Sequence, residues 1–166
     1  MKFGGTSVSD INRINNVADI VESQLGKNKI IVVLSAMAGV TNNMQKLIDD
    51  IESENKIEND LILTSGENVT IAILSSILTK RKIKSIPLLG WQVPILTDDN
   101  HQKAKILNIN KKRIISFLDD YQVLVLAGFQ GISVNGNITS LGRGGSDTTA
   151  VAVAAAVDAE RCDIYT

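Results

Sequence analysis

Ile30-Ile-Val-Val-Leu34 is a continuous run of β-branched and aliphatic residues with the length of a single strand. A second run, Val123-Leu-Val-Leu-Ala127, is equally free of polar residues. Strands that are buried on both faces have this composition, and they occur mainly in parallel sheets. We therefore expect the two runs to lie in a parallel sheet.

Segments with helical spacing of apolar residues alternate with the strands. The spacing predicts helices over residues 10–25, 42–51, 67–80 and 146–157. Weaker strands are expected over residues 83–89 and 162–166, and a minimal first strand at Lys2. Alternation of strands and helices is typical of an α/β fold with a largely parallel sheet.

Three stretches interrupt this alternation. Residues 91–106 read as an irregular hairpin excursion, in which Trp91 is expected to pack into the core or the hairpin. Residues 132–141 contain Asn135-Gly-Asn137 and are expected to form a β-hairpin. Residues 53–60 are polar and charged, so we expect a surface loop there.

Composition excludes several classes of protein. The 166 residues, 44% of them hydrophobic, suit one globular domain. Seventeen basic and 18 acidic residues leave a net charge of -1, which gives no strong field for nucleic acid or anionic lipid. Cys162 is the single cysteine, so no intramolecular disulfide can form. We expect a cytoplasmic protein without a nucleic-acid or membrane partner.

The first glycine-rich loop is Lys2-Phe-Gly-Gly-Thr-Ser7, between the first strand and the first helix. Adjacent glycines let backbone N–H groups turn toward an anion, and Lys2 supplies a positive charge. Taken alone, the loop is better explained as an ordinary turn capped by Ser7 or Ser9, because glycine pairs are common in turns. Its spacing fits neither a Walker A motif nor a dinucleotide fingerprint.

The second glycine-rich loop is Leu141-Gly-Arg-Gly-Gly-Ser-Asp147. Gly144 and Gly145 permit close backbone approach, while Ser146 or Asp147 could cap the following helix. A carboxylate would repel phosphate, so Asp147 is better suited to hold a lysine or a metal ion. Arg143 can bind a carboxylate through two parallel hydrogen bonds. Two such loops in one small domain favour a functional interpretation.

Isolated polar residues at strand and helix ends are weaker candidates. Ser35 and Thr41 follow a strand, where α/β proteins bind ligands. Glu67 starts a helix, where an acid is ordinary, but it could also pair with a substrate ammonium group. His101 reads as a surface or hinge residue rather than a catalytic base, and no metal site is expected.

Six segments together resemble the bacterial aspartokinases, a branch of the amino-acid kinases. They occur in that family's order and are Lys2-Phe-Gly-Gly-Thr-Ser-Val8, Ser35-Ala-Met37, Ser65-Gly-Glu67, Gly90-Trp-Gln92 with Thr97-Asp98, Ala127-Gly-Phe-Gln-Gly131 and residues 141–152. The resemblance implies a three-layer αβα sandwich with a mainly parallel central sheet. It also implies transfer of the γ-phosphoryl group of ATP, with Mg²⁺, to the β-carboxylate of L-aspartate, in the pathway to lysine, threonine and methionine.

The resemblance assigns roles to residues by position. Lys2 would stabilise the transition state, and Asp147 would orient the Lys2 side chain. Glu67 would bind the substrate ammonium group and Arg143 the α-carboxylate. The remaining residues of the aspartate pocket would be Ser35, Thr41 and Ser146. The residues near the phosphates would be Gly4, Gly5, Thr6, Ser7, Gly144 and Gly145.

The resemblance also bears on domain organisation. It implies that residues 1–166 form the acceptor-binding part of the kinase domain, with the nucleotide-binding part and regulatory ACT domains beyond Thr166. An unpaired sheet edge there would favour a homo-oligomer. Two alternatives remain: an inactive module that binds aspartate or self-associates, and a related kinase for glutamate, acetylglutamate or UMP.

Overall fold

The computed structural model describes residues 1–26 and 28–166. Its centre is a five-stranded sheet with the strand order β3-β6-β2-β1-β9, in which neighbouring strands are parallel. The strands are β1 (Lys2–Phe3), β2 (Ile30–Leu34), β3 (Ser85–Leu88), β6 (Val123–Ala127) and β9 (Ile164–Tyr165). The expected parallel sheet is confirmed, and β2 and β6 are neighbours in it.

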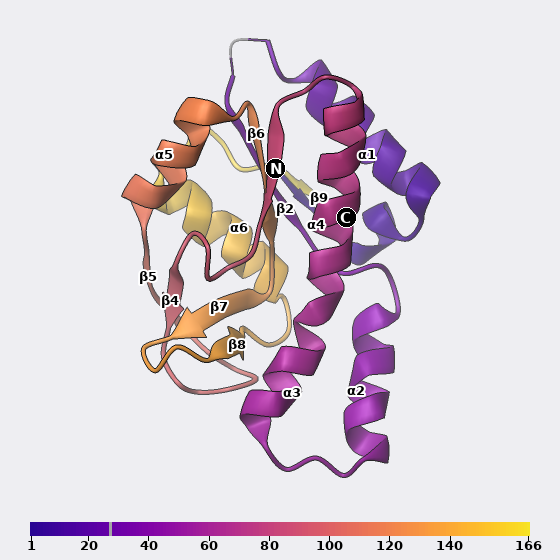
Figure 1. Cartoon of the computed structure of the whole chain (residues 1–166), viewed down its shortest axis with the longest axis vertical. Helices are drawn as coiled ribbons and strands as arrows, with labels where there is room; N and C mark the ends of the chain where they lie inside the picture. Colours follow the sequence, from indigo (N-terminus) through magenta and orange to yellow (C-terminus); the bar gives the residue numbers. More distant parts are fainter. Residues whose placement is uncertain (27) are drawn as a thin grey trace.

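Helices cover both faces of this sheet. Helices α1 (Ile11–Ser23) and α4 (Ser65–Lys80) pack on one face, and α5 (Lys111–Asp120) and α6 (Gly145–Ala156) pack on the other (Figure 1). The expected helices therefore all form, with bounds that differ by one to a few residues. This arrangement confirms the three-layer αβα sandwich.

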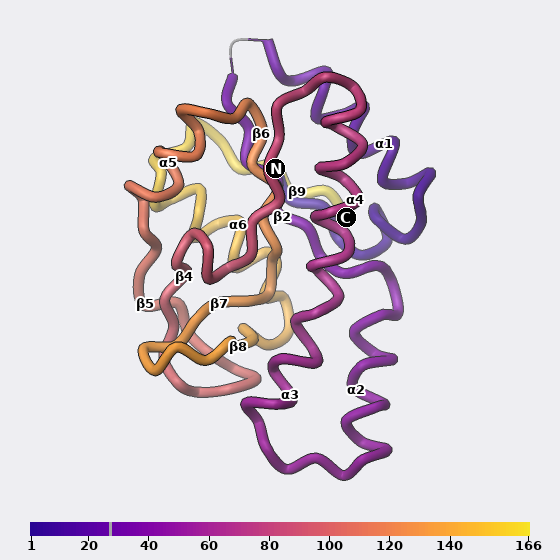
Figure 2. The backbone as a smooth tube through the Cα atoms, in the orientation of Figure 1, coloured from indigo at the N-terminus to yellow at the C-terminus, as the bar shows by residue number. Residues whose placement is uncertain are grey.

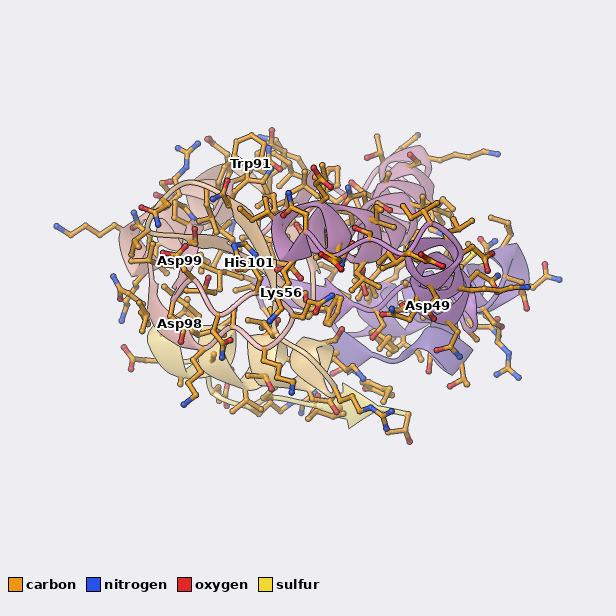
Figure 3. The ribbon with its side chains drawn as sticks, turned by 90° about the horizontal axis from the view of Figure 1, so that it is seen from below. Asp49, Lys56, Trp91, Asp98, Asp99 and His101 are labelled. Carbon is orange, nitrogen blue, oxygen red and sulfur yellow. The ribbon has the colours of Figure 1, made fainter. Side chains whose placement is uncertain are left out.

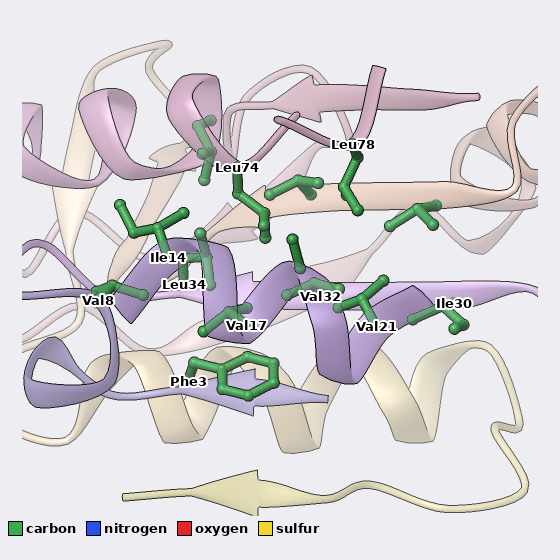
Figure 4. Packing of buried hydrophobic residues seen from close by; sticks show 14 of the residues in the cluster. Phe3, Val8, Ile14, Val17, Val21, Ile30, Val32, Leu34, Leu74 and Leu78 are labelled. Atoms are coloured by element: carbon green, nitrogen blue, oxygen red, sulfur yellow. The ribbon is translucent and has the colours of Figure 1, made fainter. Parts of the chain in front are cut away.

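The core consists of two apolar clusters separated by the sheet. Val32 of β2 packs toward α1 and α4, whereas its neighbour Val33 packs toward α6. Figure 4 shows the first cluster, where Val17 and Val21 of α1 face the sheet. Because successive side chains of a strand point to opposite faces, a strand covered on both sides must be apolar throughout.

A second, four-stranded sheet lies beside the carboxyl end of β6, as the tube in Figure 2 shows. Its order is β5-β4-β7-β8. It joins two antiparallel hairpins, β4 (Ile95–Thr97) with β5 (Ile106–Ile109) and β7 (Gln130–Ser133) with β8 (Ile138–Ser140). Both expected hairpins are confirmed, and the parallel β4–β7 pairing joins them into one sheet.

The expected surface loop at residues 53–60 is confirmed for residues 53–55 and wrong for residues 56–60. Helix α3 (Lys56–Leu63) begins there, with the Asn55 side chain accepting a hydrogen bond from the Ile57 amide at 3.1 Å. Asn59 and Asp60 are buried although they are polar, because α3 packs against α2 (Val40–Asp50) and β8. A polar sequence is therefore compatible with a buried helical face here.

The stretch Lys56–Lys80, formed by α3 and α4, is long and apolar enough by composition to cross a membrane. Half of the most apolar part of this stretch is buried inside the protein. Ile71, Leu74 and Leu78 of this stretch belong to the core cluster that contains α1. The apolar character of α4 is thus used in packing against the central sheet.

Three further features differ from expectation. Helix α5 was not anticipated, although the Asn110 side chain caps it and Ile114 is fully buried. Trp91, expected to be packed, is 47% exposed. His101 is not a surface residue, because its side chain is only 9% exposed and contacts Asp60.

Candidate functional site

A cleft of about 970 Å³ opens at the carboxyl edge of the central sheet. The segments that follow β1, β2 and β6 reach it, as do the first turns of α2, α4 and α6. Parallel α/β folds bind ligands at this edge, where helix N-termini also present free N–H groups to anions. Ten of the 13 residues named as candidates from the sequence line this cleft: Lys2, Gly5, Ser35, Thr41, Glu67, Arg143, Gly144, Gly145, Ser146 and Asp147.

Lys2 lies in β1 and is buried apart from its contact with the cleft. Its Nζ atom is 2.6 Å from Oδ1 of Asp147, in the first turn of α6. Gly4 leaves room for this amine, since a Cβ atom at Gly4 would lie 3.3 Å from Nζ. The ion pair fixes the lysine side chain in the direction of the cleft, as the sequence predicted for Asp147.

Glu67 stands in the first turn of α4 and is 2% exposed. Its Oε1 atom accepts a hydrogen bond from the Ala36 amide at 3.0 Å, while buried Oε2 has no partner among the described residues. Burial raises the pKa of this carboxyl from 4.5 to about 7. A buried carboxylate with a free oxygen is suited to binding a cation that enters the cleft.

Arg143 is exposed and lines the cleft from the loop between β8 and α6. Gly142 and Gly144, on either side of it, have positive φ angles of 75° and 72°. Side chains disfavour this conformation, so glycine at both positions shapes the loop. Gly144 occupies the N-cap position of α6 without a side-chain cap, so the alternative that Ser146 or Asp147 merely caps this helix does not hold. Both side chains are instead free to line the cleft.

The smaller polar residues Ser35, Thr41 and Ser146 also line the cleft. Thr41 is in the first turn of α2, and Ser35 directly follows β2, with its carbonyl held by Thr70 Oγ1 at 2.9 Å. Ser146 is buried at the start of α6. Gly5 lies against the Ala36 carbonyl, which a Cβ atom would approach to 2.9 Å.

Three candidates do not line the cleft: Gly4, Thr6 and Ser7. Thr6 is exposed in the short 3-10 helix η1 (Gly5–Val8). Neither Ser7 nor Ser9 caps the following helix, because the Asp10 side chain accepts from the Arg13 amide instead. Phosphate contacts of these three residues stay predictions.

The cleft also contains residues to which the sequence assigned no role in the site, notably Gln102, Lys103, Phe129 and Ser140. Of these, only Phe129 belongs to a segment that carries the resemblance. Phe129 has a positive φ of 67°, which is uncommon for a side chain of this size. Its ring explains Gly145, since a Cβ atom there would lie 2.8 Å from Phe129 Cδ2. No periodicity marks these residues, because all except Ser140 lie in loops.

The donor set at the cleft offers little to a metal ion on its own. No group of three or more His, Cys, Asp or Glu side chains able to hold a metal occurs in residues 1–26 and 28–166. Asp147 is one carboxylate near Lys2, and Mg²⁺ commonly binds through one or two carboxylates together with substrate phosphates. The residues therefore fit a metal ion that arrives on a nucleotide.

The sequence profile of the Amino acid kinase family matches residues 1–166. The chain is similar to an aspartokinase of Rickettsia felis, with 48% identity over 170 residues. That alignment covers 99% of this chain and 42% of the relative. The chain thus spans less than half the length of the curated relatives that it matches.

Solved structures show the same similarity. E. coli aspartokinase III in complex with aspartate and ADP has a TM-score of 0.86 and 26% identity, over 99% of this chain and 48% of that one. Aspartate kinase from Synechocystis has a TM-score of 0.83 and 40% identity, over 99% of this chain and 27% of that one. The fold is therefore shared with these proteins.

Proposed function

Because the chain belongs to the amino acid kinase family, we propose that it binds L-aspartate as the acceptor in an aspartate kinase reaction. In that reaction the γ-phosphoryl group of ATP is transferred to the β-carboxylate, which yields aspartyl phosphate and ADP. The product would enter biosynthesis of lysine, threonine and methionine. The relatives carry the name aspartokinase, and one structural neighbour holds aspartate and ADP.

The observation that carries this proposal is the charge arrangement of one cleft. Oε2 of Glu67 is buried and unpartnered within the described residues, while Lys2 and Arg143 line the same cleft. L-aspartate has one ammonium group and two carboxylates. Glu67 would bind the ammonium group and Arg143 the α-carboxylate, which leaves the β-carboxylate for Lys2. Ser35, Thr41 and Ser146 would complete the pocket.

The chemistry requires no protein nucleophile. The β-carboxylate is ionised at neutral pH, so one of its oxygens can attack the γ-phosphorus directly. An O–P bond forms as the bond between the γ-phosphorus and the β,γ-bridging oxygen breaks, and ADP leaves with the electron pair. Lys2 would neutralise charge on the transferring group, while Asp147 keeps its amine in position. Positioning in the cleft would supply much of the remaining rate enhancement.

ATP would approach the glycine loops from the side of Lys2. The candidate phosphate contacts are Gly4, Gly5, Thr6, Ser7, Gly144 and Gly145, next to η1 and the N-terminus of α6. Mg²⁺ would arrive on the nucleotide and would neutralise phosphate charge, and Asp147 would be the carboxylate that contacts it. We further propose a cytoplasmic homo-oligomer without a nucleic-acid or membrane partner.

Calorimetric titration of the 166-residue chain tests the acceptor site. We expect heat on adding L-aspartate, and at least about a tenfold loss of affinity in Arg143→Ala, because a two-bond contact to a carboxylate is removed. Arg113→Ala is the matched control, since Arg113 is exposed on α5, outside the cleft lining, and its guanidinium stacks over the Phe117 ring. No binding of L-aspartate, or tighter binding of L-glutamate, N-acetylglutamate or UMP, would overturn the proposal.

A further inference from the structure

Asp60 of α3 is a fully buried carboxylate that the aspartate kinase reaction does not use. Three donors converge on it: His101 Nδ1 at 2.6 Å, the Gln102 amide at 3.1 Å and Ser140 Oγ at 2.6 Å. An ionised carboxylate only accepts hydrogen bonds, so the tautomer of His101 that carries its hydrogen on Nδ1 is the one that fits an ionised Asp60. Burying a charge is unfavourable unless it is well satisfied, and this carboxylate is.

These donors come from two separate parts of the second sheet. His101 and Gln102 lie in the loop between β4 and β5, and Ser140 ends β8. In Figure 3, His101 lies between the loop of Asp98 and Asp99 and the Lys56 end of α3. Gln102 has a positive φ of 66°, a conformation that a non-glycine residue keeps only when its surroundings hold it. The contact with Asp60 supplies that restraint.

The same loop supports the glycine loop that carries Arg143. A Cβ atom at Gly142 would lie 3.1 Å from the Gln102 carbonyl oxygen, so the two backbones are in close contact. The Ala104 amide donates to the Ser140 carbonyl at 3.0 Å. The position of Arg143 therefore depends on residues that Asp60 holds.

Asp60 is also connected to Glu67, through the junction between α3 and α4. Its carbonyl accepts from the Thr64 amide at 3.0 Å and from Thr64 Oγ1 at 2.7 Å, at the junction of α3 and α4. The Gln130 side chain donates to the Thr64 carbonyl at 3.1 Å, which ties this junction to β7. The junction leads directly into the first turn of α4, where Glu67 lies.

We propose that Asp60, with His101, Gln102 and Ser140, is a positioning cluster that sets the distance between Glu67 and Arg143. The cluster would thereby adjust the cleft to an acceptor whose ammonium group and carboxylate are borne on one carbon. This inference rests on the proposed function of the cleft. Asp60 itself would not touch the substrate and would act through the loop that carries Arg143.

Selectivity between L-aspartate and β-alanine is the diagnostic readout. β-Alanine keeps the ammonium group and the reacting carboxylate of aspartate but lacks the α-carboxylate that Arg143 would bind. In Asp60→Asn we expect the preference for L-aspartate over β-alanine to fall about tenfold, as when one charge-assisted contact is misplaced. Affinity for β-alanine should change by less than about twofold. A fold that was only destabilised would lower the affinity for both ligands by the same factor.

Hydrogen exchange gives a second readout that needs no ligand. Asp60→Asn should accelerate amide exchange in residues 99–104 and 141–144 and leave β2 and β6 unchanged. Asp99→Asn is the matched control and should not accelerate exchange in residues 141–144. Asp99 is an exposed carboxylate in the same loop, and it accepts a hydrogen bond from the Asn135 side chain instead of holding the backbone of Gln102. Ser140→Ala, which removes one donor to Asp60, should shift selectivity and exchange in the same direction by a smaller amount. This variant keeps the test decisive if Asp60→Asn does not fold.

The two proposals fail in different ways. Absence of L-aspartate binding by the unaltered chain would refute the proposed function, and the exchange experiment would then decide the positioning cluster alone. Unchanged exchange in residues 141–144, or an equal loss for both ligands, would overturn the positioning role of Asp60.

Discussion

The sandwich core and the cleft at its edge are built from opposite kinds of residue. Around β2 and β6 the buried side chains are apolar and pack in two clusters. Around the cleft, Lys2, Glu67 and Asp60 are also buried, but each is charged or titratable. Burial of apolar groups favours folding, whereas burial of ionisable groups opposes it unless they are paired. The comparison indicates that the apolar core stabilises the fold and that the buried ionisable groups at the cleft lower the free energy of unfolding.

The largest effect is expected from the core. Leu126→Ala removes a fully buried side chain of β6, and we expect the free energy of unfolding to fall by about 4 kcal/mol. Urea denaturation measures this change. Leu107→Ala on the exposed side of β5 is the control and should change stability by less than about 0.5 kcal/mol. Similar losses for both variants would mean that β6 is not part of a packed core.

Glu67→Gln should show the reverse behaviour, with higher stability and lost binding. Because the pKa of Glu67 is raised from 4.5 to about 7, the folded state binds this proton more tightly than the unfolded state. The free energy of unfolding of the unaltered chain should therefore decrease as pH rises from 4.5 to about 7, and should then level off. At pH 8, Glu67→Gln should be more stable by about 3 kcal/mol.

Ligand binding supplies the complementary measurement for Glu67. Only the ionised carboxylate attracts an ammonium group, so affinity for L-aspartate should rise about eightfold between about pH 6 and about pH 7.5. Titration in buffers of different ionisation enthalpy should show proton release. Succinate, which lacks the ammonium group, should show no such rise. Equal pH profiles for aspartate and succinate would contradict the role of Glu67.

The smallest effect separates backbone strain from function. Gly144 near Arg143 and Gly136 in the β7–β8 turn both have positive φ, and no atom lies within 4 Å of a Cβ built at either. Alanine at either position should lower stability by about 1 kcal/mol. Only Gly144→Ala should also weaken L-aspartate binding, because it alters the loop of Arg143. A matching loss of binding in Gly136→Ala would remove the distinction.

The same contrast explains what could be predicted from the sequence. The bounds of β2 and β6 followed from unbroken apolar runs, because a strand covered on both faces leaves no position for a polar residue. Helix α3 was misassigned because its buried face includes Asn59 and Asp60, whose partners come from distant segments. Helix α5 was not predicted, although its Asn110 cap and the apolar Ile114 are a readable signal in the sequence.

Site residues were predicted by a different route. Lys2, Glu67, Arg143 and Asp147 were candidates because of their residue types in two glycine-rich loops and at a helix start, and the resemblance then assigned their roles. The fold brings them to one cleft. The contribution of Gln102 could not be predicted, since its position depends on a left-handed backbone held by tertiary contacts. Hydrophobic periodicity is silent about loops that are fixed in this way.

Strand β1 has a consequence for the order of folding. Its amides at Lys2 and Gly4 donate to Asp163 and Tyr165, while its Met1 and Phe3 carbonyls accept from Val33 and Ser35. The first of these pairings closes a loop of almost the whole chain, and contacts of such sequence separation form slowly. We expect the Lys2 amide to gain exchange protection after those of β2 and β6 during refolding. Lys2 would then be fixed in place only after β9 has paired with β1.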